Sequence, residues 1–256
     1  NWMYPEDFHE YITVQKGERF SYKNVYDNLS QSVHPPLYYF LLHTVCSFFP
    51  DVFSKWFGIS LNLLIFVIAQ IVLYLISSHI FEAPKTALLV CGMWGFSLAA
   101  LNTVVFIRSY MLLTLMSLLL LYAVLRMLEP KTLRLLDLSK VFLITVFGGL
   151  THYYFFVFSF FLTIWAGSFL WYEKRYREML CYGATMIFGA ASVFMLFPTI
   201  LVHFFRGTRG IEAMAGLRGI NFSPMTFFIF VHTVLNEMFG KILLFWKINP
   251  LIFDKK

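Results

Sequence analysis

The sequence predicts an all-α polytopic membrane protein, and both its composition and the length of its apolar runs point to this class. Hydrophobic residues occupy 59% of the 256 positions, charged residues only 13%, and the mean hydropathy is +0.70. Soluble domains carry about 25% charged residues, so a soluble core is not expected to bury this much apolar surface. Charge-free runs long enough to cross a hydrocarbon core of ~30 Å recur along the chain.

The charges and cysteines argue against several other classes. The net charge of +6 comes from residues in short loops between apolar runs, which is typical of membrane topology and not of nucleic-acid binding. Cys46, Cys91 and Cys181 lie far apart, in or beside apolar runs, and are expected to serve in packing. No Walker loop, nucleophile elbow or HExxH motif is present, so nothing indicates a nucleotide site.

The first element is a polar and aromatic stretch, residues 1–55, which is predicted to be an outer loop with one short helix at 37–49. This helix is too short to cross a bilayer. We expect it to lie at the membrane interface, with Tyr38 and Tyr39 at the depth of the lipid headgroups.

The motif His34-Pro35-Pro36 sets the start of this helix. Proline fixes φ near about −65° and suits the first turn of a helix, so the motif begins the helix at Leu37 and holds His34 just before it. The histidine either contacts a ligand or belongs to a plain interfacial cap.

The remaining residues, 56–256, are predicted to form a transmembrane bundle of about seven crossings. The apolar runs are 56–81, 86–107, 109–125, 141–172, 179–205 and about 224–246. Only Arg108 separates the second run from the third, so it marks a corner. The run 141–172 would be about 48 Å long as one helix, and both flanking loops are basic. We interpret it as an in-and-out pair bent near Gly148-Gly149.

The positive-inside rule then assigns the two sides of the membrane. The expected cytoplasmic loops hold Lys85, Arg126, Lys131, Arg134, Lys140, Lys174, Arg175, Arg177, Lys247, Lys255 and Lys256. The outer side is expected to hold residues 1–55, Arg108, the hairpin tip Thr151–Tyr154 and an outer loop at 206–223.

Four features of the outer side carry candidate ligand contacts: His34, Pro35 and Tyr38; Arg108 and Tyr110; His152 and Tyr153; Arg206 and Arg209. An arginine between two spans must reach water, a lipid phosphate or a partner. Guanidinium groups bind phosphate oxygens in a bidentate manner. The alternatives are snorkelling to headgroups for Arg108, a structural hydrogen bond for His152 and an ordinary basic loop around Arg206.

The acids near these features are less specific. Glu6, Asp7, Glu10, Glu18 and Asp27 lie in the first loop and Glu212 in the arginine loop, and no spacing distinguishes any of them from solvated loop acids. Each has the chemistry of a general base or an oxygen ligand for a metal.

Three motifs together carry a family resemblance. HPPLYY at His34–Tyr39, IRSY at Ile107–Tyr110 and THYYF at Thr151–Phe155 resemble the membrane-embedded glycosyltransferases of the GT-C superfamily. The nearest group is the bacterial family-39-like enzymes, which are kin to dolichyl-phosphate-mannose–protein mannosyltransferases. The resemblance extends from about residue 31 to residue 216, and HPPLYY is its most specific element.

The resemblance implies a GT-C-like helix bundle in the bacterial plasma membrane with its active site facing outside. It implies inverting transfer of a sugar from a polyprenyl-phosphate donor to a glycan, lipid or protein acceptor. His34, Pro35, Tyr38, Arg108, Tyr110, His152, Tyr153, Arg206 and Arg209 are the expected donor-binding residues. Some relatives use a divalent cation, but the sequence shows no ligand cluster that requires one, and no metal ligand is assigned.

The expected general base is the point of departure from the family. Relatives carry an Asp-Glu pair in the first outer loop, whereas this chain has the reversed pair Glu6-Asp7, and Ser32 where relatives often have aspartate. We expect the pair and a membrane anchor to lie upstream of Asn1. Asp7 and Asp27 are the weaker candidates, and an inactive protein is the remaining alternative.

Two other function classes stay open. One is a non-catalytic polytopic protein such as a lipid-linked-glycan flippase or a transporter subunit, and the other is a structural assembly subunit. A transporter is expected to carry charges near the membrane midplane and broken helices in related halves. The span interiors are nearly free of charge and no half-repeat is evident, so the sequence favours chemistry on a lipid headgroup.

Overall fold

A computed structural model describes residues 4–32, 34–129 and 133–200, and every regular element in these ranges is helical. The short elements come first: α1 (Pro5–Ile12), the 3-10 helix η1 (Lys16–Glu18), α2 (Tyr22–Ser30) and α3 (Leu37–Ser47). They are followed by α4 (Lys55–Phe81), α5 (Pro84–Gly95), α6 (Leu98–Val105), α7 (Tyr110–Leu128), α8 (Leu135–Gly149), α9 (Tyr154–Tyr172) and α10 (Tyr176–Leu196).

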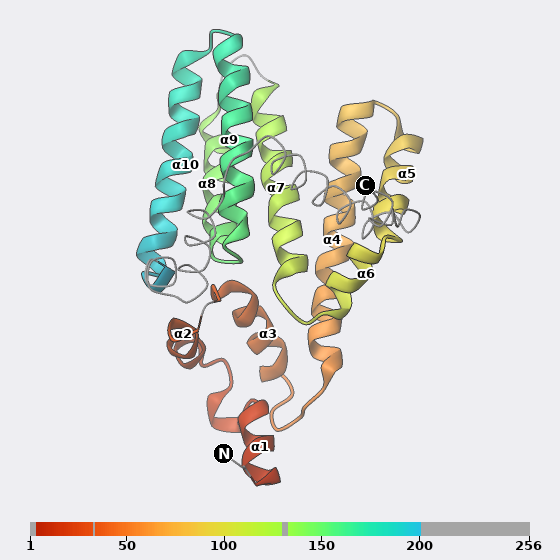
Figure 1. The fold of residues 1–256 in the computed structure, drawn as a ribbon, viewed down its shortest axis with the longest axis vertical. Coiled ribbons are helices and arrows are strands. Elements are labelled where there is room, and N and C mark those ends of the chain that lie inside the picture. Colours follow the sequence, from red (N-terminus) through yellow and green to blue (C-terminus); the bar gives the residue numbers. More distant parts are fainter. Residues whose placement is uncertain (1–3, 33, 130–132, 201–256) are drawn as a thin grey trace, which may run out of the picture.

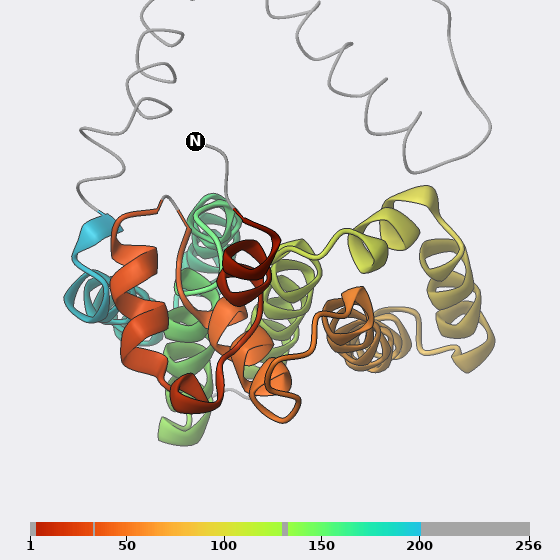
Figure 2. The ribbon, with the colours of Figure 1, turned by 90° about the horizontal axis from the view of Figure 1, so that it is seen from below.

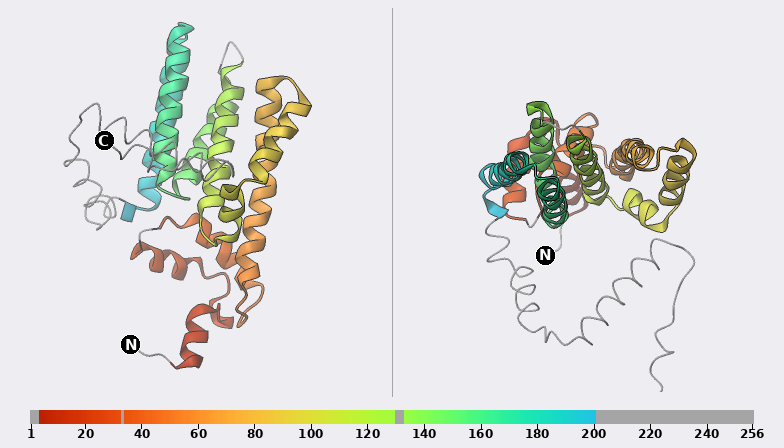
Figure 3. Two further views of the ribbon diagram at one scale, coloured as in Figure 1. Left: turned by 45° about the vertical axis from the view of Figure 1, so that its right-hand side comes forward. Right: turned by 90° about the horizontal axis from the view of Figure 1, so that it is seen from above.

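The long helices stand side by side along the long axis of the described part of the chain (Figure 1). α7 occupies the middle, with α4 on one side and α8 and α9 on the other, and α10 packs on α8 (Figure 3). α5 and α6 pack against α4 at the edge of this row. α1, α2 and α3 gather at one end of the bundle, which is the end seen from below in Figure 2.

The lengths of the helices agree with a membrane protein. α4, α7, α9 and α10 are each long and apolar enough to span a bilayer, and α5 with α6 forms a fifth candidate that is bent by 58°. α8 has 15 residues and is shorter than a usual span. The predicted crossing at 224–246 lies outside the described residues, so the total of about seven crossings stays a prediction.

Several predicted corners are confirmed. The long apolar region turns between α6 and α7, at Arg108, and the region 141–172 is a helical hairpin whose turn follows Gly148-Gly149. The bend between α5 and α6 was not expected. Ser97 begins α6 as a helix cap, because its side-chain oxygen accepts a 3.2 Å hydrogen bond from the backbone N–H of Ala100.

The helix after the proline motif begins at Leu37 as predicted but ends at Ser47, two residues early. Pro50 disfavours helical geometry in the residue before it, which favours an early end. Tyr38 is fully buried against α4 and α7. α3 packs this side of its first turn against the bundle, and the expectation that Tyr38 lies at headgroup depth stays a prediction.

Packing between α7, α8, α9 and α10 forms the larger core, with fully buried residues such as Leu120, Val141 and Leu170. Lipid tails are as apolar as leucine, so such helices are held together by close packing and not by exclusion of water. Gly189 of α10 illustrates this, since a Cβ there would lie 2.9 Å from Cγ2 of Thr145 on α8.

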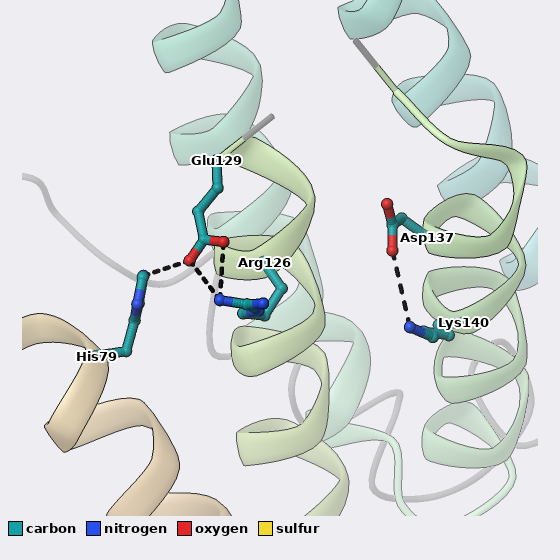
Figure 4. A network of polar contacts seen from close by, with 5 residues as sticks. All are labelled: His79, Arg126, Glu129, Asp137 and Lys140. Carbon is teal, nitrogen blue, oxygen red and sulfur yellow. Dashed lines mark hydrogen bonds and ion pairs between the residues drawn. The ribbon is translucent and has the colours of Figure 1, made fainter. Parts of the chain in front are cut away.

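The end of the bundle opposite α1–α3 is the charged end. It carries most of the basic residues expected on the cytoplasmic side, namely Lys85, Arg126, Arg134, Lys140, Lys174, Arg175 and Arg177. Glu129 there joins two helices: its carboxylate lies 2.8 Å from Nη1 of Arg126 and 3.0 Å from Nε2 of His79 on α4 (Figure 4). These basic residues and the predicted outer features, such as Arg108 and His152, therefore lie at opposite ends of the bundle, as the positive-inside assignment predicts.

Candidate functional site

The candidate site is built where the first turn of α3 meets the turn between α8 and α9. The backbone N–H of Leu37 donates a 3.0 Å hydrogen bond to the backbone carbonyl of Leu150. Pro36 and Pro35, both buried, precede this contact in the chain. The proline motif therefore does more than start a helix: it leads His34 to the hairpin that carries His152.

Arg108 comes to the same end of the bundle from the turn between α6 and α7. Its side chain is exposed, and its guanidinium carbon lies 5.3 Å from the centroid of the Phe106 ring. The ring of Phe106 in turn stacks on Tyr110 at a centroid distance of 6.1 Å and an interplanar angle of 11°. In the described part of the chain no ion pair neutralises Arg108.

His152 lies next to this turn, with its ring centroid 5.3 Å from that of Tyr110. Its Nδ1 accepts a 3.2 Å hydrogen bond from the backbone N–H of Tyr154, so the ring proton belongs on Nε2. Burial, and next the nearby charge of His34, lower the pKa of His152. His152 is therefore a neutral hydrogen-bond donor near pH 7.

Tyr39 links the proline motif to the Arg108 turn, a role that its expected headgroup depth does not indicate. Its ring lies 5.9 Å from that of His34. Burial raises the pKa of Tyr39, Arg108 lowers it and Tyr110 raises it, so all these groups are electrostatic neighbours. The only sequence signal for this role is that Tyr39 is the second tyrosine of the HPPLYY motif. We call His34, Tyr39, Arg108, Tyr110 and His152 the polar cluster.

Other predicted donor-binding residues have different surroundings. Burial raises the pKa of Tyr38 to about 12 and the neighbouring Asn62 amide lowers it, so the hydroxyl stays protonated. Burial also raises the pKa of Tyr153, which is half-buried. Arg206 and Arg209 lie outside the described residues. The donor-binding roles of all four stay predictions.

The candidate general bases are not part of the polar cluster. Asp7 lies on α1 and Asp27 on α2, and both side chains are exposed to solvent. Within residues 4–32, 34–129 and 133–200, no hydrogen bond or ion pair joins either carboxylate to the cluster. No group of three or more His, Cys, Asp or Glu residues in those ranges could hold a metal ion.

Among the described residues, the polar cluster combines a guanidinium group without an ion pair, a neutral imidazole donor and tyrosine hydroxyls beside apolar helices. A guanidinium group with neutral N–H and O–H donors is suited to an anion such as a phosphate. The apolar helices around it suit an anion that is attached to a hydrocarbon chain. Comparisons of the chain with protein-family models, with curated proteins and with solved structures give no match.

Proposed function

We propose that this protein is a glycosyltransferase that moves a sugar from a polyprenyl-phosphate donor to an acceptor at the outer face of the membrane. The observation that supports it best is the meeting of three distant motifs in the polar cluster. These motifs carry the resemblance to the GT-C enzymes, and their proximity in the fold is the support for this proposal.

Arg108 has the first role in this proposal. In an inverting transfer the acceptor atom bonds to the anomeric carbon while the bond from that carbon to the phosphate oxygen breaks. The bonding electrons leave with the polyprenyl phosphate, whose negative charge grows. A guanidinium group beside this oxygen lowers the barrier electrostatically. Arg108 is suited to it because no carboxylate in the described part of the chain competes for its charge.

His152 has a second role as a donor and not as the base. Its Nδ1 accepts a hydrogen bond from the Tyr154 N–H, so the ring proton is on Nε2 and can be donated in a hydrogen bond to a phosphate oxygen. The proton of the acceptor must go to a carboxylate elsewhere. Within this chain the candidates for that carboxylate are Asp7 and Asp27.

A transfer assay tests the proposal. The intact protein in lipid nanodiscs is supplied with polyprenyl-phosphate sugars and with membrane extracts as acceptors, and labelled products are followed by mass spectrometry. We expect donor consumption that Arg108→Gln slows about a hundredfold and that Arg126→Gln, at the charged end, leaves unchanged. Donor binding without any transfer would instead support a flippase or transporter subunit, and absence of both would overturn the proposal.

A further inference from the structure

We propose that Asn62, a buried amide inside α4, is a positioning residue that holds the Arg108 turn in its place. Asn62 is fully buried, and its Nδ2 donates to the backbone carbonyls of Val104 and Phe106, each at 3.1 Å. A third carbonyl, that of Thr103, lies at 3.5 Å. The last carbonyls of a helix have no partner within the helix, so one side chain of α4 satisfies the end of α6.

The carbonyl of Phe106 connects this amide to Arg108. It accepts the Asn62 hydrogen bond and also a 2.7 Å hydrogen bond from the backbone N–H of Arg108. Asn62 is therefore separated from the arginine backbone by a single carbonyl group. The ring of the same Phe106 residue lies beside the guanidinium and stacks on Tyr110, so its backbone orientation affects both cluster members.

Ile107, the residue after Phe106, packs on the same face of α4. Gly58, one turn before Asn62, packs so closely against Ile107 that a Cβ at Gly58 would lie 2.3 Å from Ile107 Cγ2. Phe106 and Ile107, the two residues that precede Arg108, therefore contact two successive turns of α4. The Tyr38 hydroxyl of α3 also lies near Asn62, but no hydrogen bond of good geometry joins the two side chains. The Asn62 amide of α4 therefore lies between α3 and α6.

A fluorine signal tests the positioning without any assumption about function. 4-Fluorophenylalanine at position 106 of the intact protein in nanodiscs reports the stacking of this ring on Tyr110. We expect Asn62→Leu to move the signal to the value that Tyr110→Leu produces. Gln70→Leu is the matched control, since Gln70 is an amide of the same helix that donates to a backbone carbonyl of α5, at 3.2 Å. A signal unchanged by Asn62→Leu would overturn the proposal.

A second measurement rests on the proposed function and uses decaprenyl phosphate as the probe. Loss of one hydrogen bond to a charged group weakens binding by about tenfold or more, so we expect this loss in Arg108→Gln and in Asn62→Leu. The double variant should bind no more weakly than Arg108→Gln, because Asn62 acts through Arg108. Additive losses would overturn the positioning role.

The two measurements separate the possible failures. A wild-type protein that does not bind decaprenyl phosphate would remove the proposed function, while the fluorine signal would still decide the role of Asn62. If Asn62→Leu does not fold, Asn62→Ser is measured instead, with Gln70→Ser as its control. The serine hydroxyl keeps the site polar but is too short to reach the three carbonyls, so the same shift of the fluorine signal is expected.

Discussion

The backbone N–H of Leu37 donates a 3.0 Å hydrogen bond to the carbonyl of Leu150, which joins the start of α3 to the end of α8. The N–H groups at a helix start and the carbonyls at a helix end have no partner within their own helix, so this contact satisfies one of each. It also keeps the backbone segments that carry His34 and His152 together. The polar cluster therefore depends on backbone geometry as well as on side chains.

The first prediction concerns the sides of the membrane. Single cysteines at Arg108 and His152, in a protein without its native cysteines, should react with a membrane-impermeant maleimide from the same side. Arg108 lies in the turn between α6 and α7 and His152 in the turn between α8 and α9, and the His152 ring lies 5.3 Å from that of Tyr110, at the start of α7. A cysteine at Lys174, at the charged end, should react only after the membrane is opened. Labelling of Arg108→Cys and Lys174→Cys from the same side would contradict the predicted topology.

The second prediction concerns the geometry of Arg108. Arg108→Gln should lower kcat/KM for sugar transfer about a hundredfold, as expected for the loss of one group that stabilises developing negative charge. Arg108→Lys should recover only part of this loss, because lysine keeps the charge but not the two-pronged geometry. Steady-state rates at several donor concentrations measure both effects, and full activity of Arg108→Gln would remove this residue from the site.

The third prediction concerns pH. Burial, and next the charge of His34, lower the pKa of His152, whereas in the unfolded chain it titrates near about 6.5. Below that pH the unfolded chain binds a proton that the folded protein does not. The free energy of unfolding therefore decreases as the pH is lowered, until the pH passes the pKa of His152 in the folded protein. Melting temperatures between about pH 7.5 and about pH 5.5 should fall less in His152→Gln than in the wild type.

His34→Gln provides the control for this pH effect. It removes the second cause of the shift and keeps the His152 ring, so the pKa of His152 should rise and the pH dependence should become weaker. Equal slopes in all three proteins would place the responsible groups elsewhere.

The fourth prediction concerns the turn between α8 and α9. A Cβ at Gly148 would lie 2.3 Å from ring carbons of Phe155, which is fully buried, so Gly148→Ala must displace a packed aromatic ring. Overpacking of this kind costs about 1–3 kcal/mol. We expect a lower melting temperature in detergent and a smaller fraction of folded protein after extraction.

Gly167→Ala is the matched control, because it makes the same chemical change inside α9 and has no atom within 4 Å of the added Cβ. Alanine favours a helix over glycine by about 1 kcal/mol, so this variant should melt at the same or a higher temperature. Equal destabilisation by both substitutions would show that packing against Phe155 is not the cause.

The sequence by itself determined the helical membrane class, most of the span positions, the start of α3 at Leu37 and the corner at Arg108. Each follows from a local rule: the length of an apolar run, the fixed φ of proline, or the cost of a charge in hydrocarbon. It also indicated three motifs that share one end of the bundle. The predictions at Arg206, Arg209 and 224–246 lie outside the described residues.

Only the tertiary structure decided which side chains of those motifs face one another. Tyr38 and Tyr39 are adjacent and chemically equal, yet one is fully buried and the other lies in the polar cluster. Neighbouring residues of a helix point about 100° apart, so the rotation of α3 against α4 and α7 selects between them. Nothing in the apolar run distinguishes Asn62 either, because the carbonyls that it binds lie more than forty positions away in the sequence. Only the packing of α6 on α4 brings them within hydrogen-bond distance.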